Sequence, residues 1–246
     1  MVYDYEKVED LGLKGYKIIQ NKDGFCFGSD AVLLSRFVKL KKGARVLDMC
    51  TGTGIIPVLL WGMYELSGID AVEIVPEVSD MAKRTMELNS LSDKIRVHNE
   101  DLKSCKKLFG AHSFDAVTCN PPYMNEGGGL VNPFEAKAIA RHEILCSLED
   151  VVAAAARLLR TNGRFYMIHR PQRLTDIMVL MRQYKLEPKR IRFIHPYVGK
   201  APTMVLIEGV RDGKPQVNIS APLVIYQAVN EYTEEIIDEL AEIFKI

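Results

Sequence analysis

A chain of 246 residues, 48% of them hydrophobic, is long enough for one large α/β domain with an ordinary buried core. The formal net charge is zero, which argues against a nucleic-acid binder covered in positive charge. The sequence has no apolar stretch of the roughly 18 residues that a membrane span needs, and its N-terminus lacks the basic-then-apolar order of a secretory signal. We therefore expect a cytoplasmic protein that makes no use of a membrane.

The five cysteines are odd in number and widely spread, and they include no Cys-x-x-Cys pair, so we expect neither a disulfide framework nor a bound metal. The charges are unevenly distributed along the chain. Between Arg157 and Lys214 there are 13 Lys and Arg against 4 Asp and Glu, whereas from Pro215 to the end there is 1 Lys against 6 acids. This segregation is compatible with a nucleic-acid-binding surface and equally with solvated helix faces.

The first 40 residues read as an extension to a single domain that covers the whole chain, with the main body over 41–246. Tyr16–Gln20 and Phe25–Phe27 flank Asn21–Gly24, whose Asp-Gly is a turn signal, so a small hairpin is predicted. Ser29 or Asp30 can then cap a helix, because apolar residues follow at helical spacing.

From Arg45 onward, short β-branched runs alternate with segments of helical periodicity. This alternation predicts βαβ crossovers and a doubly wound, mostly parallel sheet of seven strands with helices on both faces. The last two strands follow each other without a helix, which indicates an antiparallel C-terminal pair, and a C-terminal helix is expected after them. The expected strands are Val46–Met49, Gly68–Glu73, Ile95–His98, Phe114–Cys119, Arg164–His169, Glu187–Ile194 and Thr203–Gly209. The expected helices are Ile55–Tyr64, Pro76–Asn89, Leu148–Leu159 and Arg173–Tyr184.

The segment from Val46 to Ile56 is an apolar strand that ends in a Gly-containing turn and opens directly into a helix. Gly52 and Gly54 would let main-chain N–H groups approach a nucleotide-type ligand there. Glu73 ends the next strand 21 residues after Gly52, close to the spacing at which an acid binds both hydroxyls of a ribose.

Two details favour S-adenosylmethionine over a dinucleotide. Pro57 stands where the dinucleotide fingerprint has a third glycine, and the acid Asp48 precedes the loop, which suits a ligand with an ammonium and a sulfonium. Asp101 could accept from an adenine amino group while the Leu102 amide meets the ring nitrogen. In the competing interpretation Asp48 and Asp101 are helix caps and Glu73 is a surface acid. The predicted cofactor-binding residues are Asp48, Thr51, Gly52, Gly54, Glu73, Ile74, Asp101, Leu102 and Asn120.

The run Asn120-Pro121-Pro122-Tyr123 follows a buried strand, at the sheet edge where open α/β folds bind ligands. If the Asn120 side-chain oxygen and the Pro121 carbonyl accept the hydrogens of a conjugated exocyclic amine, they direct its lone pair at a methyl donor. Tyr123 offers a face for a planar group. Asn120, Pro121 and Tyr123 are therefore the predicted catalytic residues, against the alternative of a Pro-rich turn with local hydrogen bonds.

Weaker signals surround this motif. Gly127–Gly129 is either a lid or a loop without a role, and Arg141 and His142 either contact substrate or lie on a helix surface. Arg190 and Arg192, interleaved with aromatics, suit a phosphate track with stacking sites, although an ordinary strand with exposed Arg is the simpler interpretation.

Together these features resemble the class I methyltransferases that carry an Asn-Pro-Pro-Tyr motif. More closely, nearly the whole chain is similar to the bacterial tRNA adenine-N6 methyltransferases that act beside the anticodon of a valine tRNA. Cys50 is a departure, because many relatives have Gly or another small residue there. The matching segments are Phe27–Leu34, Val46–Ile56, Val72–Ile74, Asn120–Tyr123, Ala140–Glu143, Gly163–Phe165 and His195–Pro196.

This resemblance implies S-adenosylmethionine as cofactor, methyl transfer to N6 of an adenine and a tRNA partner. A glutamine methyltransferase acting on a protein shares the motif, but it needs no basic segment and typically has a larger N-terminal domain. A methyltransferase for rRNA or DNA amines, a non-catalytic RNA-binding module and a dehydrogenase complete the alternatives. The sequence specifies no oligomeric state, and a monomer is the default expectation.

Overall fold

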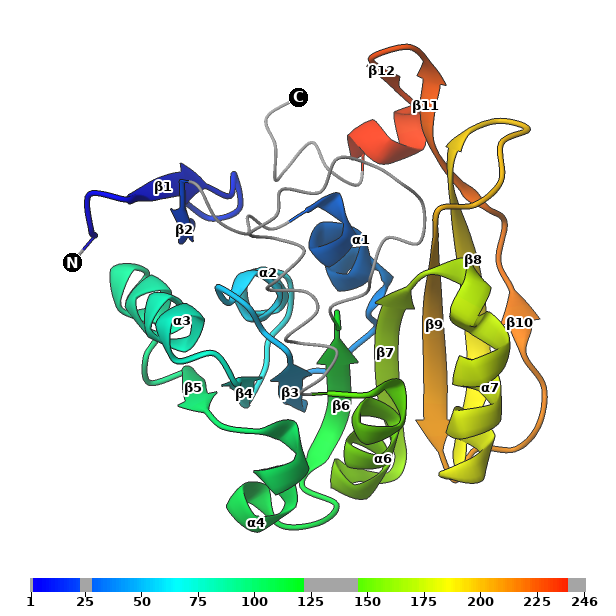
Figure 1. Ribbon diagram of the computed structural model, residues 1–246, viewed down its shortest axis with the longest axis horizontal. Coiled ribbons are helices and arrows are strands. Elements are labelled where there is room, and N and C mark those ends of the chain that lie inside the picture. The colour runs from blue at the N-terminus through cyan, green and yellow to red at the C-terminus, as the bar shows by residue number, and fades with distance from the viewer. Residues whose placement is uncertain (1, 23–27, 122–145, 239–246) are drawn as a thin grey trace.

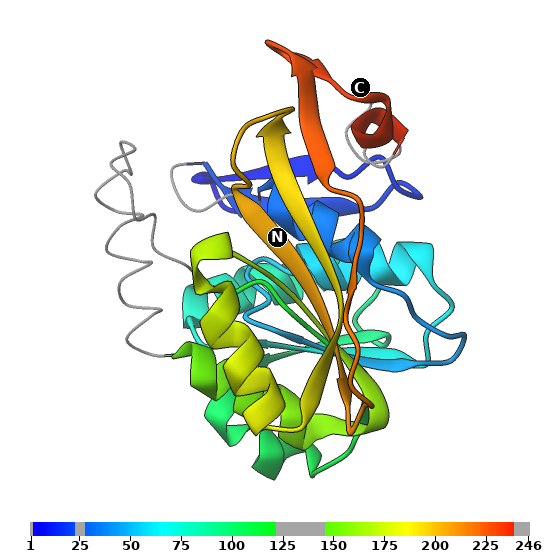
Figure 2. The ribbon, with the colours of Figure 1, turned by 90° about the vertical axis from the view of Figure 1, so that its right-hand side faces the viewer.

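The computed structural model describes residues 2–22, 28–121 and 146–238. A mixed sheet runs through the molecule with helices on both faces (Figures 1 and 2). Its strand order is β12-β11-β8-β9-β7-β6-β3-β4-β5, with β10 paired to β8. The doubly wound α/β fold expected from the alternating pattern is confirmed.

The centre of the sheet is parallel, because each of its strands is followed by a crossover that returns the chain to the same edge. Its strands are β3 (Arg45–Met49), β4 (Gly68–Glu73), β5 (Ile95–Asn99), β6 (Phe114–Cys119) and β7 (Leu159–His169). The three central strands β3, β4 and β6 are buried along almost their whole length, as strands covered by helices on both faces are, whereas β5 and the start of β7 carry exposed polar residues. All five therefore direct their carboxyl ends to one edge, where ligands bind in such sheets.

Two hydrophobic clusters hold the helices against the sheet, one on each face. The first contains side chains of α1 (Ser29–Phe37), α2 (Ile55–Met63) and α3 (Pro76–Leu88). The second lies under the helices α4 (Cys105–Phe109), α6 (Leu148–Leu158) and α7 (Leu174–Gln183), with short 3-10 turns at Leu102–Ser104 and Pro171–Arg173.

The C-terminal part contains the expected antiparallel strands, but it also enlarges the sheet. β9 (Met204–Arg211) lies between β7 and β8 (Leu186–Tyr197) and is antiparallel to both. Three further strands, β10 (Asn218–Ile219), β11 (Leu223–Ala228) and β12 (Glu231–Tyr232), continue beyond β8. Within the described residues the sheet therefore has ten strands and the expected count of seven is wrong, because the segment after β9 pairs along the edge that β8 leaves open. A helix begins at 234.

The N-terminal hairpin is confirmed, but its strands differ from those expected. β2 (Lys17–Asn21) pairs with β1 (Glu6–Asp10), which precedes it in the chain, through a turn with Gly12 and Gly15 at φ of 66° and 73°. The expected arm Phe25–Phe27 lies outside the described residues.

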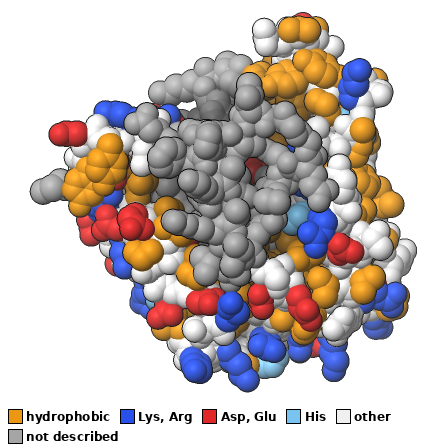
Figure 3. Space-filling view, in the orientation of Figure 1, with side chains coloured by type: hydrophobic (Ala, Val, Ile, Leu, Met, Phe, Trp, Pro, Cys, Tyr) orange, Lys and Arg blue, Asp and Glu red, His pale blue; other side chains and the backbone are white. Residues whose placement is uncertain are grey.

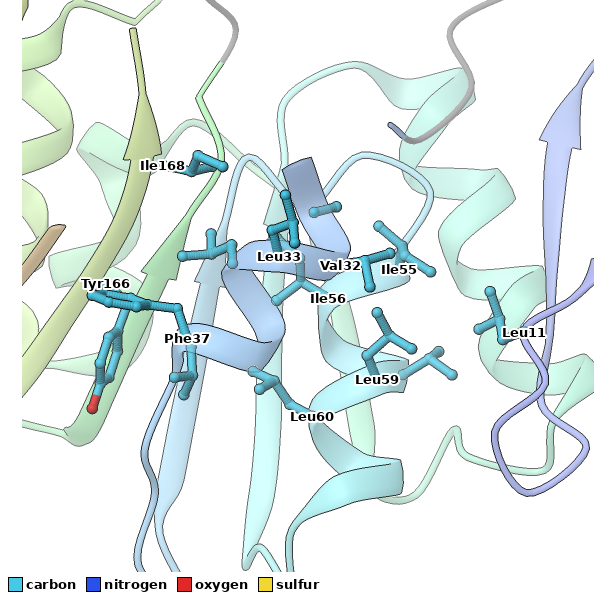
Figure 4. Packing of buried hydrophobic residues seen from close by; sticks show 14 of the residues in the cluster. Leu11, Val32, Leu33, Phe37, Ile55, Ile56, Leu59, Leu60, Tyr166 and Ile168 are labelled. Carbon is cyan, nitrogen blue, oxygen red and sulfur yellow. The ribbon is translucent and has the colours of Figure 1, made fainter. Parts of the chain in front are cut away.

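Helix α1 begins at Ser29, but its cap is Gly28 and neither Ser29 nor Asp30. Figure 4 shows α1 between α2 and β7, with Leu33 and Phe37 of α1 facing Ile56, Leu60 and Tyr166. The Tyr166 ring meets Phe37 edge to face at 6.4 Å, and its hydroxyl donates to the Lys39 carbonyl. Packing on both sides fixes α1 and whatever its first turn presents.

Among the described residues, no helix is long and apolar enough to cross a membrane. The same part of the chain holds no group of three His, Cys, Asp or Glu placed to bind a metal ion.

Candidate active site

The loop between β3 and α2 has a left-handed backbone at three residues: Cys50, Gly52 and Gly54 have φ of 56°, 58° and 90°. A Cβ on Gly52 would meet nothing within 4 Å, so this part of the loop faces open space. A Cβ on Gly54 would lie 2.5 Å from Met86 Cε, so Gly54 lets α2 approach α3 closely. Cys50 is a non-glycine residue in a conformation that favours glycine, which gives the departure noted in the sequence a physical meaning.

Asp48, at the end of β3, is fully buried. Thr118 of β6 donates to Asp48 Oδ1 at 2.6 Å, while Oδ2 has no partner among the described residues. Burial raises the pKa of Asp48 from its ordinary 3.8 to about 7. Nearby, the Thr51 hydroxyl is also buried and without a hydrogen bond in the described structure. Asp48 is therefore no helix cap. The Thr51 hydroxyl lies close enough to the Asp48 carboxyl to lower its pKa slightly, but within the described ranges neither this hydroxyl nor Asp48 Oδ2 has a hydrogen bond of normal geometry, so both can receive a cationic ligand group.

Glu73, at the end of β4, is 3% exposed and is not a surface acid. Its two oxygens accept from the Gly52 and Val75 amides, each at 3.0 Å. Each carboxylate oxygen retains a second lone pair for another donor. Glu73 thus anchors the glycine loop and can still accept from a ligand hydroxyl.

Asp101 does cap a short helix, because its side chain accepts from the Lys103 amide at 2.9 Å. It also lines a pocket beside the glycine loop. The residues that line this pocket are Cys50, Val72, Glu73, Ile74, Glu100, Asp101, Leu102 and Cys146. The structure thus brings together Glu73, Ile74, Asp101 and Leu102 as expected, and it adds Cys50, Glu100 and Cys146, to which the sequence pattern gave no role.

Asn120 follows β6, and the two ends of its side-chain amide differ: the nitrogen has a hydrogen bond and the oxygen has none among the described residues. Its Nδ2 donates to Asp30 Oδ2 at 3.2 Å, whereas its Oδ1 is buried and has no partner among the described residues. Pro121 is buried beside it. Tyr123, Arg141, His142 and Gly127–Gly129 lie outside the described residues.

Asp30 is a site residue that the sequence pattern did not identify, since it reads there as a helix cap. Its only signal is its place in the segment Phe27–Leu34 that resembles the tRNA methyltransferases. The contact with Asn120 joins residues 90 positions apart, which no local pattern can reveal.

Arg190 and Arg192 on β8 are largely enclosed, with side chains 18% and 17% exposed. Arg190 pairs with Glu208 at 2.8 Å and stacks over the Phe37 ring at 3.7 Å, while Arg192 pairs with Glu235. Both nevertheless line one pocket between α1 and β8. Its lining consists of Leu33, Arg36, Phe37, Lys39, Arg190, Arg192, Leu206, Ser220 and Ala221.

The rest of the basic segment is also extensively paired. Its ion-paired arginines are Arg160, Arg164, Arg173, Arg182, Arg190, Arg192 and Arg211. Figure 3 shows Lys and Arg mixed with Asp and Glu along the lower edge of the molecule in this view. The excess of positive charge in this stretch of sequence is therefore largely neutralised in the fold. In the pocket between α1 and β8, Lys39 is exposed and has no ion pair among the described contacts.

Comparison with known proteins agrees with this geometry. The family model of the methyltransferase small domain matches residues 21–184. A solved structure described as a predicted O-methyltransferase from Agrobacterium tumefaciens has a TM-score of 0.71 at 21% identity, over 87% of this chain and 96% of that one. The chain is therefore a methyltransferase of the small-domain family.

Curated relatives narrow this class. A tRNA1(Val) (adenine(37)-N6)-methyltransferase from Trichodesmium erythraeum is 30% identical over 72% of this chain and 76% of its own length. A protein of the same name from Porphyromonas gingivalis is 28% identical over 80% of this chain and 79% of its own length. The chain belongs to the family of tRNA1(Val) (adenine(37)-N6)-methyltransferases.

Proposed function

We propose that this protein transfers a methyl group from S-adenosylmethionine to the exocyclic N6 of an adenine in tRNA, with the whole chain acting as one methyltransferase domain. The observation that carries the proposal is the amide of Asn120. Its oxygen is a buried acceptor without a partner in the described structure, directly after β6 at the carboxyl edge of the sheet. A buried acceptor is costly to leave unpaired, so such an atom indicates a donor that arrives with a ligand.

The residues around the glycine loop fit S-adenosylmethionine. Unpartnered oxygens of Asp48 and Thr51 suit the ammonium of its methionine part, and Glu73 suits the ribose hydroxyls. Asp101 and Leu102 in the adjoining pocket suit the adenine. When bound, the cofactor supplies a methyl group on a sulfonium, whose departing thioether is neutral.

The remaining chemistry is orientation of the accepting nitrogen. The lone pair of an aromatic amine is delocalised into its ring, which makes the nitrogen a poor nucleophile. Hydrogen bonds from the amine to Asn120 Oδ1 and the Pro121 carbonyl would direct this lone pair at the methyl carbon. Transfer to this nitrogen would leave it cationic, and it would then lose a proton to water, so the site needs no strongly basic side chain. Stacking on Tyr123 would hold the base in place.

The pocket lined by Arg36, Lys39, Arg190 and Arg192 supports an RNA substrate. We assign it to a backbone phosphate, because guanidinium and ammonium donors surround it and Glu208 and Glu235 only partly offset their charge. Arg141 and His142 remain candidates for substrate contacts. The names of the relatives favour adenine 37 of a valine tRNA as the target.

The decisive experiment is to incubate the protein with methyl-labelled S-adenosylmethionine and, separately, unmodified tRNA, DNA and a translation release factor. We expect label in tRNA alone, located at N6 of adenine after nuclease digestion. Label in the release factor would instead identify a glutamine methyltransferase, and label in DNA would identify a DNA amine as substrate.

A further inference from the structure

We propose that Asp30 is a positioning residue for methyl transfer, which fixes the Asn120 amide so that its oxygen faces the incoming amine. The inference rests on the proposed function, because it gives a role to a side chain that holds the predicted catalytic residue. No feature of the sequence pattern assigned Asp30 to the reaction.

The orientation of the amide follows from the chemistry of its partner. Asp30 Oδ2 lies 3.2 Å from Asn120 Nδ2, and Asp30 Oδ1 accepts from the Ala31 amide at 2.9 Å. An ionised carboxylate only accepts hydrogen bonds, so it bonds the nitrogen end of an amide and repels the oxygen end. Oδ1 of Asn120 must then point away from Asp30, and it is this atom that is buried without a partner in the described structure.

The fold holds Asp30 firmly. It lies in the first turn of α1, which is packed between α2 and β7 (Figure 4). Gly28 leaves the space that the carboxylate occupies, because a Cβ there would lie 2.7 Å from Asp30 Oδ1. An amide bonded to a side chain on such an element loses little additional freedom when substrate binds, which is the condition for orientation catalysis.

The charge of Asp30 also favours the reaction itself. A carboxylate that accepts from an amide nitrogen polarises the amide and makes its oxygen a stronger acceptor. During methyl transfer the attacking nitrogen becomes positive, and a fixed negative charge behind the amide stabilises that developing charge.

The first test is Asp30→Asn, which keeps the shape of the side chain and removes its charge. An asparagine can donate to Asn120 Oδ1 as readily as it accepts from Nδ2, so the amide loses its fixed orientation. We expect kcat to fall by about 10- to 100-fold, in the range seen for a lost oriented group, with unchanged affinity for S-adenosylmethionine. Asp176→Asn is the matched control, since Asp176 is likewise an acid in the first turn of a helix, α7, but pairs with Arg173 at the surface. It should leave kcat unchanged.

The second test exchanges the two side chains. In Asn120→Asp alone, two carboxylates would face each other, whereas in Asp30→Asn with Asn120→Asp an amide again donates to a carboxylate whose second oxygen can accept from the amine. We expect the double variant to be at least about tenfold more active than Asn120→Asp, because a direct contact makes the two substitutions non-additive. Independent, additive losses in the two positions would overturn the proposal.

A third readout needs no cofactor and no substrate. The side-chain NH2 signals of Asn120, identified by their loss in Asn120→Ala, should shift and exchange faster with water in Asp30→Asn than in Asp176→Asn. Unchanged signals would refute the contact even if tRNA proved to be the wrong substrate. Conversely, shifted signals in a protein that methylates no tRNA would contradict the proposed function and leave the Asp30 contact standing.

Discussion

At the scale of single residues, we predict that substitution of Asn120 affects the rate of methyl transfer but not the affinity for the cofactor. Asn120→Ala should lower the rate of methyl transfer on the order of a hundredfold, since the loss of one oriented acceptor in a water-poor site costs about 3 kcal/mol of transition-state stabilisation. Affinity for S-adenosylmethionine, measured by calorimetry, should stay nearly constant, because Oδ1 is turned toward the amine. Wild-type turnover in this variant would refute the amine-orienting mechanism.

Asp48 gives a pH dependence with a definite sign. Its pKa is raised to about 7, so the free protein carries a protonated Asp48 below that pH, while a bound ammonium favours the carboxylate. Binding of S-adenosylmethionine at pH 6 should therefore release a proton, and affinity should weaken up to tenfold per pH unit below about 7.

Calorimetry in two buffers of different ionisation enthalpy measures this proton release directly. Asp48→Asn, which has no proton to lose, should bind more weakly and show no difference between the buffers. An equally buffer-independent enthalpy in the wild type at pH 6 would exclude Asp48 as the partner of the ammonium.

The position of Asp48, Glu73, Asp101 and Asn120 at one edge of the sheet could be predicted from sequence, because each lies at or just after the end of a parallel strand; their roles in binding and catalysis stay predictions. Asp30 could not be predicted as a site residue, because its role depends on a contact across 90 positions and its local pattern is that of a helix start. Cys50 marked the loop as atypical, but only the backbone shows that it occupies a left-handed conformation.

At the scale of secondary structure elements, one buried ion pair joins the N-terminal hairpin to helix α3. Arg84 of α3 donates to both oxygens of Glu6 of β1 at 2.6 and 2.7 Å, and the Glu6 side chain is fully enclosed. Glu6→Gln would remove the bidentate partner of Arg84, while the half-exposed Asp80 remains with its Oδ2 2.8 Å from Arg84 Nε. We expect a loss of about 2 kcal/mol in the free energy of unfolding, measured by urea denaturation, because Asp80 still offsets part of the Arg84 charge.

Glu9→Gln on the same strand is the control for this prediction. Glu9 is more exposed and pairs with Lys7 at the surface, and the Gln20 amide that donates to it can donate equally to the amide oxygen of the variant, so the substitution should cost less than about 1 kcal/mol. Equal effects of the two substitutions would show that the pair does not fasten the hairpin.

The element boundaries show which patterns carry information. β4 and β6 have the predicted bounds, and the predicted helices end within a residue of those observed. The bounds of such elements can be predicted because the hydrophobic periodicity is clear and stops at identifiable residues. The pairing of β2 with β1 was not predicted, because β1 is short and has no clear pattern, whereas the predicted arm Phe25–Phe27 lies outside the described residues. β10, β11 and β12 were not predicted. β10 and β12 have only two residues and therefore no period, and β10 and β11 are defined by pairing with β8 while β12 is defined by pairing with β11.

At the scale of the whole molecule, the distribution of charge predicts where RNA binding is sensitive to salt. Lys39 lines the pocket between α1 and β8, is exposed and has no ion pair among the described contacts. Lys39→Ala should therefore reduce by about 1 the slope of log tRNA affinity against log salt concentration. Fluorescence anisotropy with tRNA at several salt concentrations measures this slope.

Lys42→Ala is the matched control, because Lys42 is 83% exposed and pairs with Glu65 away from that pocket. Its slope should equal that of the wild type. If both lysines changed the slope equally, phosphate binding would be diffuse and the pocket would have no special part in it.

The net charge of a sequence segment was a poor guide to this surface. Arginines of the basic segment pair with acids from distant parts of the chain, such as Asp115 with Arg160 and Glu235 with Arg192, and these pairings exist only in the folded protein. Counting charges along the chain therefore located the basic strand correctly but overestimated its free charge.

Helix α1 connects two of the features described above, since Asp30 in its first turn contacts Asn120 and Phe37 at its end lines the pocket between α1 and β8. At a rise of 1.5 Å per residue the helix separates them by about 10 Å. In the proposed reaction α1 thus keeps the site of the reacting base and the site of a phosphate of the same strand at a fixed distance from each other. One residue inserted into α1 would turn Asp30 by about 100° relative to the pocket, so the base and the phosphate could no longer occupy both sites at once. Substitutions that preserve the helix would leave the register of the RNA unchanged.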